Sequence, residues 1–248
     1  MDETFLSVIS GRHCKRAFLD RPVPRAILER VLTVAGHAPS PRNTQFWQAA
    51  VVVGEARTEL SRRLLCAAES TDHYAHDYAN RPVPMGALPE RRAFTWGAGY
   101  YGALGIARDD KAGRREVERR NLCFYGAPVV MVFHLPAAAV PGTFLEMGFF
   151  LQNVMLGLVA SGLGSCPQYS AARYADVLRG TLGIGPDRII VCTLCVGYVD
   201  ESAPINSFHP ERAPLGEYTR WHGDADEVPD TRPVPLAHAR PSDPHKSR

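Results

Sequence analysis

Apolar residues recur at helical or strand spacing along the chain as far as residue 222. Between residues 24 and 36 they fall on one helical face, which a proline opens and a glycine ends. The helices predicted from this pattern cover residues 4–10, 24–36, 57–68, 90–105, 143–161 and 171–182, and the predicted strands cover 49–53, 128–135 and 188–199. This order predicts one α+β domain over residues 1–222, with helices around a small sheet.

The segment 143–161 is apolar nearly all round, although it contains Glu146, Gln152 and Asn153. A helix of this kind is buried on every side, either at the centre of a fold or in a subunit interface. The polar residues within the run argue against a membrane span. We therefore expect a buried helix and no membrane partner.

Three stretches have a less regular pattern. The proline-rich residues 73–89 predict an irregular excursion, which is either a long connection or a lid over a binding site. The charged residues 108–120 lead to the strand at 128–135. Residues 162–170 are rich in glycine and predict a turn, which either lets the backbone approach a ligand or only ends the preceding helix.

The composition is that of a soluble globular protein, with 45% hydrophobic and 22% charged residues among 248. The formal net charge of +2 is too small for a nucleic-acid partner, because binding to a phosphate backbone needs a basic surface. The N-terminal residues lack the pattern of a secretion signal, which predicts a cytoplasmic protein. Residues 223–248 form a polar, proline-rich tail that is typical of a disordered segment or of one draped over a partner.

The cysteines and histidines predict neither disulfides nor a metal site. Six cysteines in a protein that is not secreted are expected to be free thiols. Cys192 and Cys195 lie three apart in the apolar strand 188–199, so they should point to opposite faces as buried thiols. His73 and His76 have no companions at metal-ligand spacing.

The candidate chemistry lies in two segments near the N-terminus. Arg12 and Arg16 stand four residues apart, close enough to bind one phosphate by charge-assisted hydrogen bonds. The proline-stiffened segment 39–47 runs directly into the strand at 49–53. Taken singly, the first is typical of a solvated helix face and the second of a turn. Together they favour a site for a phosphorylated, planar cofactor.

In their order and spacing these segments resemble the FMN-dependent nitroreductase family. The usual pattern of that family is Arg-x-Ser-x-Arg-x-Phe, then a helix, then Pro-Ser-x-x-Asn-x-Gln-Pro-Trp. The chain departs from it at Cys14, where serine is usual, and at Phe46, where proline is usual. Because a thiol is a weak hydrogen-bond donor, we expect Cys14 to affect cofactor affinity or redox potential. The segment 124–128 and the late turn 212–215 also match, so the resemblance covers about residues 3–222.

The resemblance implies a nitroreductase-like fold, in which helices surround a central mixed or antiparallel sheet. It also implies an intertwined homodimer that buries the helix 143–161 and binds FMN between its two chains. Arginines would bind the phosphate, residues 39–43 would line the isoalloxazine from the partner subunit, and residues 167–170 would border its reactive edge. The positions that match cofactor contacts of the family are Arg12, His13, Cys14, Arg16, Pro39, Ser40, Asn43, Pro167, Gln168, Tyr169, Ser170 and Arg212.

The implied activity is reduction of a small nitroaromatic or quinone acceptor by NADH or NADPH in a ping-pong cycle. The flavin carries the chemistry, so no side chain is assigned a catalytic role. Reductive dehalogenation, reduction of an activated alkene and non-catalytic flavin binding are alternatives on the same scaffold. Aromatic side chains suit a flat acceptor site, and the candidates are Phe94, Trp96, Tyr100 and Phe124, although each is more typical of a core residue.

Overall fold

The computed structural model of the chain describes residues 3–70 and 74–222. His73, which opens the expected excursion, and the expected tail 223–248 lie outside the described residues. The described chain divides into two units, Thr4–Pro210 and a terminal unit that includes residues 211–222, and each is described by itself. The terminal unit contains one short 3₁₀ turn, Leu215–Glu217.

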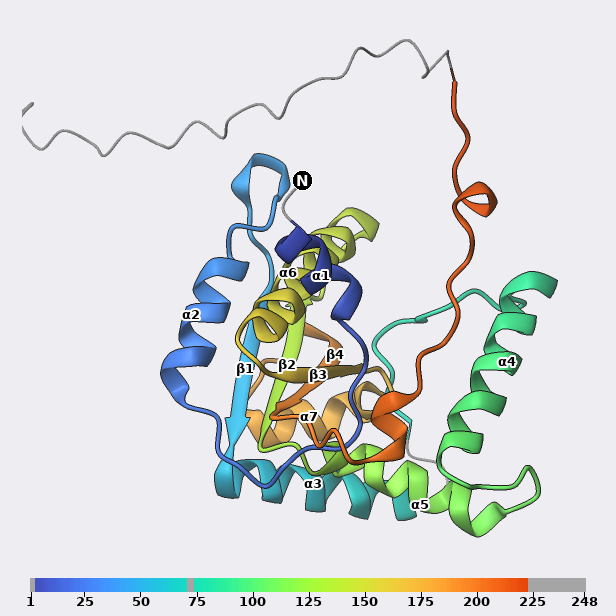
Figure 1. Cartoon of the computed structure of the whole chain (residues 1–248). Helices are drawn as coiled ribbons and strands as arrows, with labels where there is room; N and C mark the ends of the chain where they lie inside the picture. Colours follow the sequence, from blue (N-terminus) through green and yellow to red (C-terminus); the bar gives the residue numbers. More distant parts are fainter. Residues whose placement is uncertain (1–2, 71–73, 223–248) are drawn as a thin grey trace, which may run out of the picture. The chain divides into compact units, whose positions relative to one another are not determined.

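Four antiparallel strands form the sheet, in the order β1-β2-β4-β3 (Figure 1). β1 (Gln48–Val53), β2 (Val129–Pro136) and β4 (Arg188–Gly197) confirm the predicted strands. β3 (Gly164–Gln168) corrects the prediction of a turn at 162–170, because these residues pair with β4 along their whole length. Strand periodicity is hard to detect in so short a segment that also contains glycine and proline.

The helices agree with the predicted ones to within a few residues, with one addition. The charged stretch 108–120 contains a helix that the apolar pattern does not reveal, because its exposed faces are polar. Asp110 begins this helix by accepting a hydrogen bond from the Gly113 N–H at 2.8 Å. The helices are α1 (Glu3–Gly11), α2 (Arg25–Ala35), α3 (Gly54–Glu69), α4 (Ala87–Ala103), α5 (Lys111–Leu122), α6 (Pro141–Ala160) and α7 (Ala175–Leu182).

A hydrophobic core covers each face of the sheet. On one face the odd-numbered residues of β2, such as Met131, pack with α2 and α6. On the other face the even-numbered residues, such as Val130, pack with α3 and α7. Cys192 belongs to the first core and Cys195 to the second, which confirms the prediction that they are buried on opposite faces.

One face of α6 packs against α2 and the sheet, and the other is open within the described chain. Phe150 and Leu158 are buried, whereas Leu145 is 60% exposed and Phe149 is 40% exposed. The expectation of burial on every side therefore holds for one face of α6. Among the described residues, α6 is also the helix long and apolar enough to cross a membrane by length and composition, a test that core helices of soluble proteins pass as well.

The segment between α3 and α4 is fixed to the core near its start. The Asp77 carboxylate accepts hydrogen bonds from the Arg179 guanidinium and, at 2.7 Å, from the Ile190 N–H. The Tyr78 hydroxyl donates to the Val191 carbonyl at 2.7 Å. Of the two interpretations of this stretch, a long connection or a lid, these contacts favour an ordered connection for residues 75–78.

Candidate functional site

The segment 12–18, here called the arm, follows α1 and lies along the free edge of β3. Cys14 forms a parallel bridge with Ser165, and the Lys15 N–H donates to the Ser165 carbonyl at 3.0 Å. Phe18 forms a second bridge with Val199, just after β4. The arm therefore extends the sheet and holds Arg12 and Arg16 beside β3.

The buried Asn206 fixes the backbone of the arm. Its side-chain oxygen accepts the Arg16 N–H at 2.7 Å, and its amide donates to the Ala17 and Asp200 carbonyls, both at 2.8 Å. The bonds to Arg16 and Ala17 join segments 190 and 189 positions apart in the sequence, and Asn206 is only 2% exposed. The position of Arg16 is thus set by tertiary hydrogen bonds.

The guanidinium of Arg16 lies against aromatic rings of α4. It is 5.0 Å from the centroid of the Tyr100 ring and 5.7 Å from that of Trp96. Burial opposes the charge of Arg16, yet the surrounding thiol and phenol groups leave its pKa raised. Arg16 is consequently a fixed, permanent cation with aromatic neighbours.

A cleft of about 600 Å³ opens over this cation. Its walls come from α4, α5 and the segment 167–170, and they combine arginine with aromatic side chains. Trp96 and Tyr100, two of the four aromatic candidates, line it. The other two do not: Phe94 is 65% exposed outside the cleft, and Phe124 is a fully buried core residue.

The segment 167–170 lines the cleft, but its polar side chains are largely turned toward the protein. Gln168 is 3% exposed and bonds Asn121 and Thr193. The Ser170 hydroxyl donates to the Asn121 side-chain oxygen. The Tyr169 hydroxyl donates to the Tyr78 carbonyl and contacts His76 Nδ1 at 3.1 Å. The polar groups of Gln168, Tyr169 and Ser170 are thus bonded within the protein.

The other candidate residues near the N-terminus divide into two groups. Arg12, His13 and Cys14 lie on the arm but do not line the cleft. The His13 ring stacks on that of His209 at 3.9 Å between centroids. A hydrogen bond with the Cys166 thiol, together with burial, raises the pKa of the Cys14 thiol well above its usual range. Cys14 is therefore protonated at neutral pH.

Pro39, Ser40 and Asn43 do not line the cleft. They belong to an exposed loop before β1, in which Asn43 has a left-handed φ of 60°. The Ser40 hydroxyl accepts the Gln45 N–H at 3.2 Å and so stabilises the loop itself. Arg212 belongs to the terminal unit.

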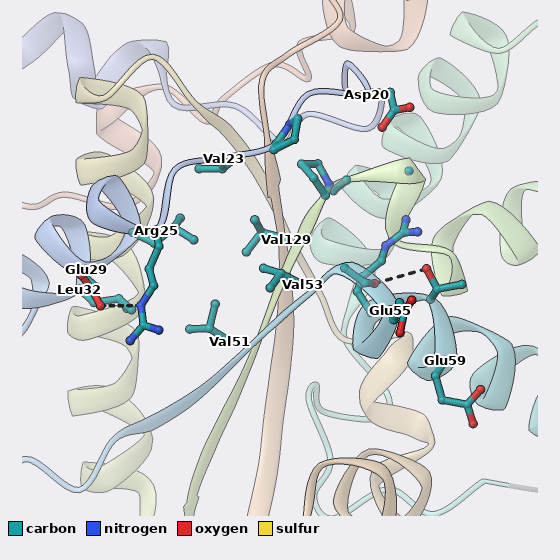
Figure 2. Close-up of a pocket in the computed structure, with 18 residues that line it drawn as sticks. Asp20, Val23, Arg25, Glu29, Leu32, Val51, Val53, Glu55, Glu59 and Val129 are labelled. Atoms are coloured by element: carbon teal, nitrogen blue, oxygen red, sulfur yellow. Dashed lines mark hydrogen bonds and ion pairs between the residues drawn. The ribbon is translucent and has the colours of Figure 1, made fainter.

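A larger cavity of about 950 Å³ lies elsewhere, between α2 and α3 (Figure 2). Val51, Val53 and Val129 lie between the two helices, and Arg25 and Glu29 pair at 2.7 Å on its rim. None of the residues that match cofactor contacts of the family lines it. We therefore place the candidate site in the smaller cleft, where cationic and aromatic groups converge.

Two asparagines and a tyrosine complete this site and were not identified from the sequence. Asn206 fixes the arm, whereas Asn121 and Tyr125 support the segment 167–170 from α5 and the turn after it. Asn121 lies in a charged helix whose pattern contains no binding motif, so no local signal distinguishes it.

Comparisons with known proteins identify the family of the chain. The model of the nitroreductase family matches residues 9–198. The chain is 34% identical over 223 residues to 4-nitrobenzoate reductase of Pseudomonas putida, covering 90% of this chain and 97% of that one. It is 38% identical over 215 residues to nitroreductase NfnB of Mycolicibacterium smegmatis, covering 86% and 91%.

Solved structures show the same likeness. The FMN and NADPH-dependent nitroreductase NfnB from Sphigopyxis sp. strain HMH superposes with a TM-score of 0.87 at 38% identity, over 89% of this chain and 99% of that one. The FMN-dependent NfnB from Mycobacterium smegmatis in complex with NADPH superposes with a TM-score of 0.85 at 35% identity, over 88% and 97%. The chain belongs to the nitroreductase family.

Proposed function

We propose that the chain is an FMN-dependent oxidoreductase that uses NAD(P)H to reduce nitroaromatic acceptors. The observation that carries this proposal is the cleft in which Arg16, a fixed cation, lies among aromatic rings. Ligand sites of 300–1,000 Å³ are typical for cofactors and small molecules, and about 600 Å³ falls within that range.

The residues present fit FMN, which has a flat aromatic ring system and a phosphate. Arg12 and Arg16 would bind the phosphate and ribityl groups by charge-assisted hydrogen bonds. The aromatic lining of the cleft would stack on flat ligands, and the backbone of 167–170 would border the ring edge. The loop 39–43 of a second copy would complete the site.

Bound FMN supplies the two-electron chemistry that side chains lack. The chain's own residues bind and orient the reactants and exclude water from the cleft. NAD(P)H and the acceptor occupy the cleft in turn, which gives a ping-pong order. A nitro group that accepts two electrons and two protons yields a nitroso group and water.

The second copy would be supplied by a homodimer. Leu145 and Phe149 leave an apolar face of α6 exposed, and α1 adds exposed Phe5, Leu6 and Ile9. Large apolar patches of this kind are typical of subunit interfaces. We propose that these faces are covered in a cytoplasmic homodimer.

The proposed activity predicts acceptor-dependent oxidation of NADPH. Purified full-length protein loaded with FMN is expected to consume NADPH rapidly when 4-nitrobenzoate is added, and slowly without an acceptor under anaerobic conditions. The decrease in NADPH absorbance measures this rate, and nitrobenzene and a benzoquinone serve as further acceptors. A loaded protein that reduces none of them would refute the proposed activity.

Cys14 provides a test of how this chain departs from the family pattern. Cys14→Ser is expected to strengthen FMN binding about three- to tenfold, because a hydroxyl is a better donor and one hydrogen bond contributes about 0.5–1.5 kcal/mol net. Fluorescence titration of the apoprotein with FMN measures the affinity, and dye equilibration measures the flavin potential. If both quantities equal those of the unmodified protein, the cysteine is a neutral replacement.

A further inference from the structure

One side chain, Asn121 of α5, connects most of the polar groups beneath the cleft. Its oxygen accepts from the Gln168 amide at 2.8 Å and from the Ser170 hydroxyl, and its amide donates to the Tyr125 hydroxyl at 2.6 Å. The Asn121 carbonyl also accepts from the Gln168 amide at 2.8 Å. Asn121 thus contacts two positions of the segment 167–170 at once.

The same side chain leads to Arg16 on the opposite side of the cleft. Tyr125, which Asn121 bonds, lies close to Tyr100, since both line the cleft and both line, with Arg16, a small void of about 10 Å³. The Tyr100 ring in turn lies 5.0 Å from the Arg16 guanidinium. Neighbouring side chains, from Asn121 through Tyr125 and Tyr100, therefore lead from the segment 167–170 to Arg16 of the arm.

Burial makes this arrangement difficult to replace with water. Gln168 is 3% exposed and Thr193 is fully buried, and the Thr193 hydroxyl donates to the Gln168 side-chain oxygen at 3.3 Å. A buried polar group left without its partner costs about 1–3 kcal/mol. Loss of the Asn121 side chain would therefore force Ser170 and Gln168 to move toward new partners and shift the backbone that faces the cleft.

We propose that Asn121 is a positioning residue for the cofactor site, which sets the backbone of 167–170 and the place of Arg16 relative to each other. The proposal rests on the proposed function, since it takes FMN as the occupant of the cleft. Asn121 acts through its neighbours and touches no reacting atom in this account.

The test compares FMN affinity and flavin potential in Asn121→Leu and the unmodified full-length protein. Leucine has a similar size but removes the three side-chain hydrogen bonds. The FMN dissociation constant is expected to rise at least about tenfold, equivalent to about 1.4 kcal/mol. The flavin midpoint potential, measured at saturating FMN, is expected to shift because the backbone beside the ring moves.

Tyr125→Phe is the milder companion variant, because it removes one hydroxyl and leaves the ring in place. It is expected to shift the flavin potential in the same direction and to weaken FMN binding about two- to fivefold. This variant decides the question if Asn121→Leu does not fold.

Arg57→Met is the matched control. Arg57 donates to the Cys123 carbonyl at 2.7 Å, next to the same end of α5, but lies outside the cleft. The Arg57→Met variant should have a lower unfolding temperature but the FMN affinity and flavin potential of the unmodified protein. Lower stability with unchanged affinity and potential in both test variants would overturn the proposal for Asn121. An unmodified protein that binds no FMN would instead overturn the proposed function.

Discussion

Arg16→Gln is expected to weaken FMN binding by about 10- to 100-fold. Arg16 is the cation fixed beneath the cleft by Asn206 and by the rings of Tyr100 and Trp96. A hydrogen bond to a charged group contributes about 1.5–3 kcal/mol, and glutamine keeps neither the charge nor the forked geometry. Titration of the apoprotein with FMN, followed by fluorescence, measures the loss.

The loss of FMN affinity in Arg16→Gln should be specific to the cleft and not a general result of removing an arginine that is stacked on an aromatic ring. Arg21→Gln provides the matched control, because the Arg21 guanidinium lies 3.9 Å from the Tyr198 ring centroid and outside the cleft. Each variant is expected to lose about 0.5–2 kcal/mol of unfolding free energy. Equal FMN affinity in the two variants would contradict the role given to Arg16.

The double variant Leu145→Glu, Phe149→Glu is expected to convert the proposed dimer into a monomer. Both side chains are exposed on α6 in the single chain, and burying a large apolar side chain contributes about 1.5–3 kcal/mol. Two glutamates would remove that contribution and place like charges in the interface. Sedimentation velocity at micromolar concentration measures the change.

This variant should also lose FMN, since the loop 39–43 of a second copy would no longer be present at the cleft. Val34→Glu is the control, because Val34 on α2 is similarly exposed, at 60%, but lies on another helix. It should leave both mass and FMN content unchanged. A double variant that remains dimeric with full FMN content would exclude this face of α6 from the interface.

Much of the fold can be predicted from the sequence, because its strongest patterns are local. β2 and β4 are continuous apolar runs, and α2 has one apolar face bounded by proline and glycine. α5 has no such pattern, since most of its residues are polar and exposed. β3 exists because β4 and the arm provide hydrogen-bond partners on both sides, which its own sequence does not indicate.

The residues of the site also divide into those with a local sequence pattern and those that depend on distant partners. Arg12 and Arg16 stand out because their spacing is visible in seven consecutive residues. Asn206 acts on Arg16 across 190 positions, and Asn121 acts on Gln168 across 47. Contacts of this kind exist only once the chain has folded, so no local pattern predicts them.

FMN-dependent nitro reduction is tested by an anaerobic absorbance spectrum of the purified full-length protein during addition of NADPH and then of 4-nitrobenzoate. We expect a bound yellow flavin that NADPH bleaches and that the nitro compound restores. A colourless protein that cannot be loaded with FMN, or a bound flavin that NADPH does not reduce, would contradict it.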